Sequence, residues 1–168
     1  MKIAVIGYSG SGKSTLSEYL GNKYNIPVLF LDTVQFLPGW RERDFDEGKK
    51  IVLDFMNNDS WVIDGNYRKY YRDERLEQAD EIIFMNFNRI TCFFRVYRRY
   101  RIYKGKSRMS MAEGCHEKLD YEFIKWILRD GRKKGIRSKY KSIAEMYKDK
   151  ITIIKNQRQL DDYINSIK

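Results

Sequence analysis

The chain has 168 residues, a formal net charge of +10, two cysteines and one histidine. This length suits one domain with a substantial core, so we expect residues 1–168 to form a single domain. So few cysteines and histidines exclude a disulfide framework and a zinc site, and Cys115 and His116 are expected to be a surface pair. With no apolar run of membrane-spanning length and no room for a signal peptide before the first strand, we expect a cytoplasmic protein without a membrane partner.

The first element is an apolar run at residues 3–6 (IAVI), which predicts a buried parallel strand. Residues 7–14 (GYSGSGKS) follow at once and fit the pattern G-x-x-x-x-G-K-[ST]. Leu16 and Leu20 then fall at helical spacing, and Gly21 is expected to end that helix. A strand, a glycine-rich loop and a helix in this order predict a phosphate-binding site.

The chemistry of this phosphate loop (residues 7–14) explains its residue types. The glycines allow backbone angles that turn successive N–H groups toward a polyphosphate, and the start of a helix favours an anion there. Lys13 can reach the β- and γ-phosphates of ATP, and the Ser14 hydroxyl can ligate Mg²⁺. The residues expected to bind the nucleotide are Gly7, Ser9, Gly10, Ser11, Gly12, Lys13, Ser14 and Thr15.

Further along the chain, apolar runs predict strands at 26–31, 61–63, 82–87 and 151–154. Between them, helices are expected at about 45–57, 68–78, 90–103, 121–147 (in pieces) and from about 157. Strands that alternate with helices predict an α/β, three-layer P-loop NTPase fold, in which a five-stranded parallel sheet is flanked by helices. The nucleotide is expected at the carboxyl ends of the strands.

Two carboxylates are placed at predicted strand ends. Asp64 ends the third strand, where it could hold Mg²⁺ opposite Ser14. Asp32 is expected at the tip of the second strand, where it could orient an acceptor hydroxyl and take its proton. An aspartate that caps a turn is the alternative for each of them.

The positive charge is concentrated in residues 89–141, which hold 17 Lys or Arg against 5 Asp or Glu, a net charge of +12. The rest of the chain has 16 against 18, a net charge of −2. A local excess of this size implies an anionic partner. Polyphosphate substrates would explain it, and nucleic acid is the competing, less favoured explanation.

Four segments carry a resemblance to a known family: residues 7–15 (GYSGSGKST), 31–40 (LDTVQFLPGW), 61–67 (WVIDGNY) and 95–99 (RVYRR). Through them the chain resembles the adenylate-kinase-like P-loop kinases, most closely a bacterial group labelled DNA topology modulation protein. The resemblance covers nearly the whole chain. It implies a short helical lid at about 104–120, which includes Lys106 and Arg108, and an acceptor-binding segment at about 33–60.

The resemblance also implies roles for single residues. Residues 64–68 (DGNYR) are similar to the D-G-F-P-R segment of adenylate kinases, whose arginine binds the acceptor's phosphate; Arg68 stands there, although a solvated side chain is an equal alternative. Arg95 would stack on the adenine, and Arg99 would contact the phosphates. The implied catalytic set is Lys13, Asp32, Arg95, Arg99 and Arg129, and the implied acceptor set is Asp32, Trp40, Arg41, Asn66 and Arg68.

Together these features predict an Mg²⁺-dependent phosphotransferase that uses ATP and a small acceptor, with a hydroxyl acceptor narrowly favoured over a phosphate because of Asp32. The alternative is an ATP-binding regulatory or DNA-binding protein that affects DNA topology, with residues 89–141 as its nucleic-acid surface. Against that alternative, the sequence has no helix-turn-helix, zinc or RNP signature. The oligomeric state is left open.

Overall fold

A computed structural model describes residues 1–105, 110–112, 114–117 and 119–167. Its centre is a parallel sheet of five strands in the order β2-β5-β1-β6-β7. The strands are β1 (Lys2–Gly7), β2 (Val28–Phe30), β5 (Trp61–Asp64), β6 (Glu81–Met85) and β7 (Ile151–Ile154). The predicted five-stranded parallel sheet is therefore confirmed.

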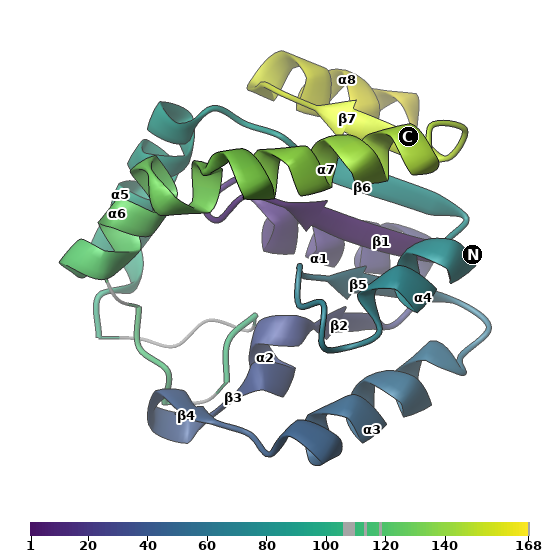
Figure 1. Ribbon diagram of the computed structural model, residues 1–168, viewed down its shortest axis with the longest axis horizontal. Coiled ribbons are helices and arrows are strands. Elements are labelled where there is room, and N and C mark those ends of the chain that lie inside the picture. Colours follow the sequence, from purple (N-terminus) through teal and green to yellow (C-terminus); the bar gives the residue numbers. More distant parts are fainter. Residues whose placement is uncertain (106–109, 113, 118, 168) are drawn as a thin grey trace.

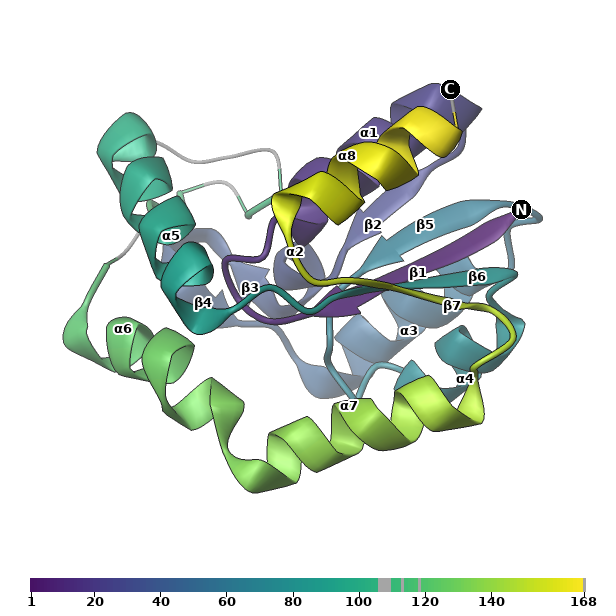
Figure 2. The ribbon, with the colours of Figure 1, turned by 90° about the horizontal axis from the view of Figure 1, so that it is seen from above.

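Helices cover both faces of the sheet and make the predicted three layers (Figures 1 and 2). One face is covered by α3 (Phe45–Met56), α4 (Arg72–Gln78) and α7 (Lys134–Met146), and the other by α1 (Lys13–Tyr24), α5 (Arg89–Tyr103) and α8 (Gln157–Ser166). Helix α6 (Tyr121–Leu128) packs beside α5, and a short 3-10 turn, Asp130–Arg132, joins it to α7. Within the described residues, no helix combines the length and apolarity needed to cross a bilayer.

The strands are apolar at successive positions because both faces of the sheet are buried. In β1, Ala4 and Ile6 pack into the core under α3, α4 and α7, whereas Ile3 and Val5 pack into the core under α1, α5 and α8. All four side chains are at most 1% exposed. This is the pattern that fully covered parallel strands require.

Helix α1 continues past the residue that was expected to end it. It runs to Tyr24 and stops at Asn25, whose φ of 52° is left-handed. Gly21 lies inside the helix, where a Cβ atom would come within 2.1 Å of Val28 Cγ2 on β2. This glycine therefore marks a close helix–strand contact, and the prediction that it stops the helix is wrong.

The acceptor-side segment also differs from expectation. Strand β2 ends at Phe30, and helix α2 (Leu31–Gln35) begins at once with the buried Leu31. Asp32 therefore lies in the first turn of a helix, just past the strand tip where it was expected. A small hairpin follows: β3 (Phe36–Leu37), a 3-10 turn (Pro38–Trp40) and β4 (Arg41–Glu42).

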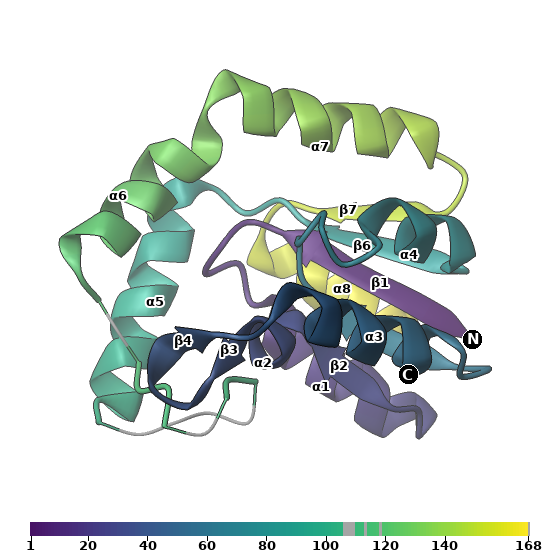
Figure 3. The ribbon, with the colours of Figure 1, turned by 60° about the horizontal axis from the view of Figure 1, so that its bottom comes forward.

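Two further boundaries are corrected. Residues 68–71 form a turn before α4, so the helix expected from residue 68 begins four residues later. In the segment 104–120, the described residues form turns and bends, and the helical parts of this region are α5 and α6, which border it on either side (Figure 3). Lys106 and Arg108, assigned to the lid, lie outside the described residues.

Candidate nucleotide and acceptor site

The phosphate loop connects β1 to α1 at the carboxyl edge of the sheet. Gly7, Gly10 and Gly12 have φ values of 145°, 78° and 96°, which side chains rarely adopt. At Gly10 a Cβ atom would also come within 2.6 Å of Val96 Cγ2 and 2.7 Å of the Cys92 carbonyl oxygen on α5. The glycines thus give the loop its curvature and let α5 pack directly against it.

A hydroxyl and a carboxylate meet at the mouth of the loop. Ser14, in the first turn of α1, donates a 2.7 Å hydrogen bond to Asp64 Oδ2 at the end of β5. Lys13 Nζ donates to the carbonyl of Tyr8 across the loop at 3.1 Å. Hard oxygen donors of this kind suit Mg²⁺, which usually completes its coordination with phosphate oxygens and water. The described residues contain no group of three or more His, Cys, Asp or Glu that could hold a metal without such oxygens.

Asn66 fastens the turn after β5 to the phosphate loop. Its Nδ2 donates to the Gly7 carbonyl at 2.7 Å, and its Oδ1 accepts from the Gly7 N–H at 3.0 Å. The side chain was predicted to bind the acceptor. Its amide makes both of these bonds to the loop backbone and so fixes the loop's entry from β1. Asn66 also lines the cavity described below, and its role toward the acceptor stays a prediction.

The next residue, Tyr67, holds the other carboxylate. Its hydroxyl donates a 2.8 Å hydrogen bond to Asp32 Oδ1. Burial, together with the negative charge of Asp32, raises the pKa of Tyr67, which keeps the donor protonated. Sequence reasoning missed Tyr67 even though the WVIDGNY motif contains it, because a tyrosine after a strand gives no sign of its partner.

A buried arginine supports this turn from below. The Arg75 guanidinium is fully buried and donates to the carbonyl oxygens of Gly65, Tyr67 and Tyr70, at 3.3, 3.0 and 2.8 Å. Burial lowers its pKa to about 10. Because the three bonds fix the backbone between Gly65 and Tyr70, they also fix where Asn66 and Tyr67 point. Nothing in the sequence of α4 distinguishes Arg75 from a solvated surface charge.

Arg95 and Arg99, four residues apart on α5, contact different parts of the molecule. Arg95 donates to the Ser11 carbonyl and, at 2.5 Å, to Gln157 Oε1 at the start of α8, and it lies 4.0 Å from the Phe87 ring centroid. Arg99 instead donates to Glu117 Oε1 at 2.8 Å, in the segment expected to be the lid. Arg95 therefore borders the nucleotide loop, and Arg99 ties α5 to residue 117.

Two arginines, Arg129 and Arg132, follow α6. Arg129 was assigned to catalysis, but Arg132 is the one that contacts the phosphate loop. The Arg129 side chain is 76% exposed and lies 3.8 Å from Asp130 Oδ1. Arg132 stacks on the Tyr8 ring of the phosphate loop at 3.5 Å and donates to the Phe87 carbonyl at 2.7 Å. Its burial lowers its pKa. Arg132 thus contacts the phosphate loop, although the sequence distinguishes it from no other cation of the basic segment 89–141.

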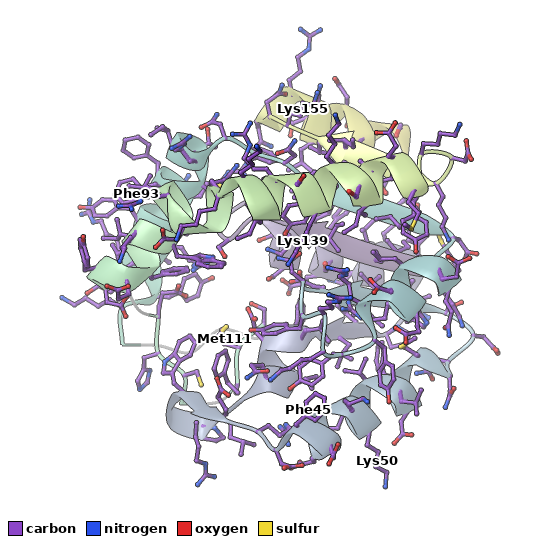
Figure 4. The ribbon with its side chains drawn as sticks, viewed as in Figure 1. Phe45, Lys50, Phe93, Met111, Lys139 and Lys155 are labelled. Carbon is purple, nitrogen blue, oxygen red and sulfur yellow. The ribbon has the colours of Figure 1, made fainter. Side chains whose placement is uncertain are left out.

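A cavity of about 230 Å³ lies beside the phosphate loop, between the turn after β5 and helices α6 and α7. Trp126 borders it and donates to Ser9 Oγ at 3.3 Å. Figure 4 labels Lys139 beneath α7. Among the described residues that line the cavity there is no carboxylate, and the cations are Arg68, Arg72, Arg132 and Lys139. This electropositive cavity is suited to a small anionic molecule.

Asp32, Trp40 and Arg41, expected in the acceptor site, are not among the residues that line this cavity. Trp40 Nε1 donates to the carbonyl of His116 at 3.2 Å, and its ring stands edge-on to that of Phe36. Cys115 Sγ lies 3.3 Å from the Leu37 carbonyl oxygen and is 1% exposed, so the expectation that it lies on the surface is wrong. Cys115 and His116 of the lid segment therefore contact the hairpin of β3 and β4.

The comparisons with known proteins give the fold. No family model and no curated protein matches the chain. Among solved structures, it is similar to a deoxyadenosine kinase from M. mycoides with bound dATP (17% identity, 99% of each chain, TM-score 0.53). It is also similar to a shikimate kinase from Bacteroides thetaiotaomicron (17% identity, 99% of this chain and 96% of that one, TM-score 0.51) and to an uncharacterised protein from Eubacterium ventriosum (20% identity, 99% and 98%, TM-score 0.53).

These likenesses confirm the fold that the resemblance implies, that of P-loop kinases, and leave the DNA topology modulation group unconfirmed. At 17–20% sequence identity, these similar structures show the fold of the chain and not its activity. Together with the parallel sheet, its flanking helices and the glycine-rich loop at the carboxyl end of β1, they show that this chain has the three-layer α/β fold of the P-loop kinases.

Proposed function

We propose that this protein is an Mg²⁺-dependent kinase that transfers the γ-phosphoryl group of ATP to a small, negatively charged acceptor. The observation that carries the proposal is the 2.7 Å contact between the Ser14 hydroxyl and the Asp64 carboxylate at the mouth of the phosphate loop. A glycine-rich loop that opens a helix binds phosphates by its N–H groups, and a hydroxyl with a carboxylate beside it suits the accompanying Mg²⁺.

For the nucleotide, we propose that Lys13 leaves the Tyr8 carbonyl and turns to the β- and γ-phosphates. The contacts of Arg95 with Ser11 and Gln157 support an adenine site between α5 and the start of α8. When bound, Mg²⁺ would neutralise charge on the β- and γ-phosphate oxygens. The protein groups would contribute mainly position and fixed positive charge.

For the acceptor, the cavity beside the phosphate loop supports an anionic group held by cations such as Arg68 and Arg132. Asp32, fixed by Tyr67, would orient a hydroxyl of the same molecule. In the proposed step the hydroxyl oxygen bonds to the γ-phosphorus, the bond to the β–γ bridging oxygen breaks, ADP leaves, and the hydroxyl proton passes to the Asp32 carboxylate.

The test begins with binding. Saturating MgATP should raise the melting temperature of the wild type, since a ligand at about 100 times its Kd stabilises by roughly 2.7 kcal/mol. Lys13→Ala should shrink that shift, and Lys50→Ala, on the distant helix α3, serves as the matched control. If neither ATP nor GTP moves the wild-type transition, nucleotide binding is wrong.

Transfer is then measured as ADP formation against pairs of alcohols that differ only by a phosphate or carboxylate group. The proposal expects turnover with the anionic member of a pair and little with the neutral one. Should Asp32→Asn leave turnover intact while Arg68→Ala abolishes acceptor binding, the accepting atom is a phosphate oxygen and the hydroxyl acceptor is wrong.

A further inference from the structure

A second, larger hollow shares Tyr8 of the phosphate loop with the cavity described above. It has a volume of about 1000 Å³, is open to solvent, and runs between the N-terminal end of α5, helix α7 and the end of β7. None of the described residues that line it is Asp or Glu, and its cations are Arg89, Arg132, Arg137, Lys141 and Lys155. Like charges gathered this closely raise the local potential and attract a ligand that carries several negative charges.

Exposed aromatic rings continue from this groove along the outside of α5. Ile90 lines the groove, and Phe94 and Tyr97 follow it at i+4 and i+7, on the same side of the helix. Phe94 is 62% exposed and Tyr97 is 44% exposed. Arg98 and Arg101 are exposed on the same helix. Cations and unburied aromatic rings therefore form one continuous surface.

The size of this hollow, its exposed cations and the exposed rings beside it indicate which class of molecule the surface can bind. A small anion would fill little of a hollow of 1000 Å³. Four of its five cations, Arg89, Arg137, Lys141 and Lys155, are exposed, so they can contact the phosphates of a chain laid along the hollow. Duplex DNA keeps its bases paired and stacked, so the exposed rings of α5 would find no free base to stack on. A single strand suits it, because its phosphates can follow a charged groove while unpaired bases stack on exposed rings.

We propose that the groove between α5, α7 and β7 binds single-stranded nucleic acid. This binding does not depend on the kinase reaction. Of the cations that line the groove, only Arg132 also lines the cavity beside the phosphate loop. Tyr8, Arg132 and Tyr140 line both hollows, so a bound strand would lie next to that cavity.

The experiment measures anisotropy of labelled oligothymidylate and oligouridylate of about 15 nucleotides, within the usual site size of such surfaces. The wild type should bind both, and log K should fall with log salt by roughly 0.7 per phosphate contact. Arg137→Glu/Lys141→Glu should weaken binding at least tenfold and flatten the salt slope. The control, Lys50→Glu/Lys148→Glu, makes the same change of charge at two exposed lysines outside the groove.

A second pair of variants tests stacking. Phe94→Ala should weaken binding about 5- to 150-fold, the range for losing one stacked base. Phe45→Ala, at an exposed phenylalanine on α3, should not. The proposal is overturned if both charge-reversed doubles weaken binding equally, if a duplex of the same length binds more tightly, if only anionic phosphatidylserine vesicles bind, or if no oligonucleotide binds at low salt.

Discussion

Two neighbouring side chains after β5 act on opposite parts of the site. Asn66 holds the backbone of Gly7 in the phosphate loop, and Tyr67 holds the carboxylate of Asp32 on α2. A single turn thus sets the distance between the nucleotide loop and the proposed base, and the buried Arg75 fixes that turn. A small shift of the Arg75 side chain would therefore move both the phosphate loop and Asp32.

This arrangement predicts a graded response at Asp32. Tyr67→Phe removes one hydrogen bond to a carboxylate, a loss of about 1.5–3 kcal/mol, and should lower kcat roughly tenfold or more with little change in the KM for ATP. Asp32→Asn removes the base and should cost about 10²–10⁴-fold. Steady-state kinetics of both variants provide the measurement. A Tyr67→Phe enzyme that is fully active while Asp32→Asn is dead would show that the hydrogen bond has no role.

On α5, the different partners of the two arginines predict different defects. Arg95→Ala loses contacts with the phosphate loop and with Gln157, so it should mainly raise the KM for ATP. Arg99→Ala loses Glu117 of the lid segment and should mainly lower kcat. The two variants are compared at saturating acceptor over a range of ATP concentrations. Indistinguishable kinetics would contradict this division.

At the scale of elements, apolar runs in the sequence predicted the five strands of the sheet, but not every residue at which a strand or helix begins or ends. Runs such as Ile3 to Ile6 were reliable because burial on both faces demands apolar residues at each position. Gly21 misled because a glycine that ends a helix and one that lets a strand approach look alike in sequence. The hairpin of β3 and β4, four residues in strands, is too short to leave a periodic pattern.

The same reasoning applies to the site. The position of the glycine-rich loop between β1 and α1, with Asp64 beside it, could be predicted because the loop has a fixed residue pattern and both follow apolar strands of one parallel sheet. Arg75 and Tyr67 could not, since their partners are backbone and side-chain atoms brought close only by the fold. The cavity cations also come from separate segments, so their meeting is a tertiary feature.

A pair of glycine variants tests the helix–strand contact. Gly21→Ala places a Cβ atom 2.1 Å from Val28 Cγ2, so it should lower the free energy of unfolding by about 1–3 kcal/mol. Gly135→Ala, in the first turn of α7 with no atom within 4 Å of the added Cβ, should raise it by about 0.4–1 kcal/mol. Urea denaturation of both provides the check. Equal effects of the same sign would show that packing at Gly21 is unimportant.

At the scale of the whole molecule, every part of the site reaches the same edge of the sheet. The phosphate loop, Asp64 and the turn after β5 follow the carboxyl ends of neighbouring strands β1 and β5, as in other open α/β sheets. The lid segment and the β3–β4 hairpin then meet over that edge, through Trp40 with His116 and Cys115 with Leu37.

Because of that contact, the rate at which the Cys115 thiol is modified measures how often the hairpin and the lid segment separate. A thiol reagent can reach this sulfur only while the hairpin and the lid segment are apart, whereas Cys92, also fully buried, lies in the core under α5. Cys115 should therefore be modified early, at a rate set by local opening, and Cys92 only at the rate of global unfolding. MgATP together with the acceptor should slow the first reaction. Mass spectrometry follows each thiol in time, and simultaneous modification of both would mean that the two segments never part in the folded protein.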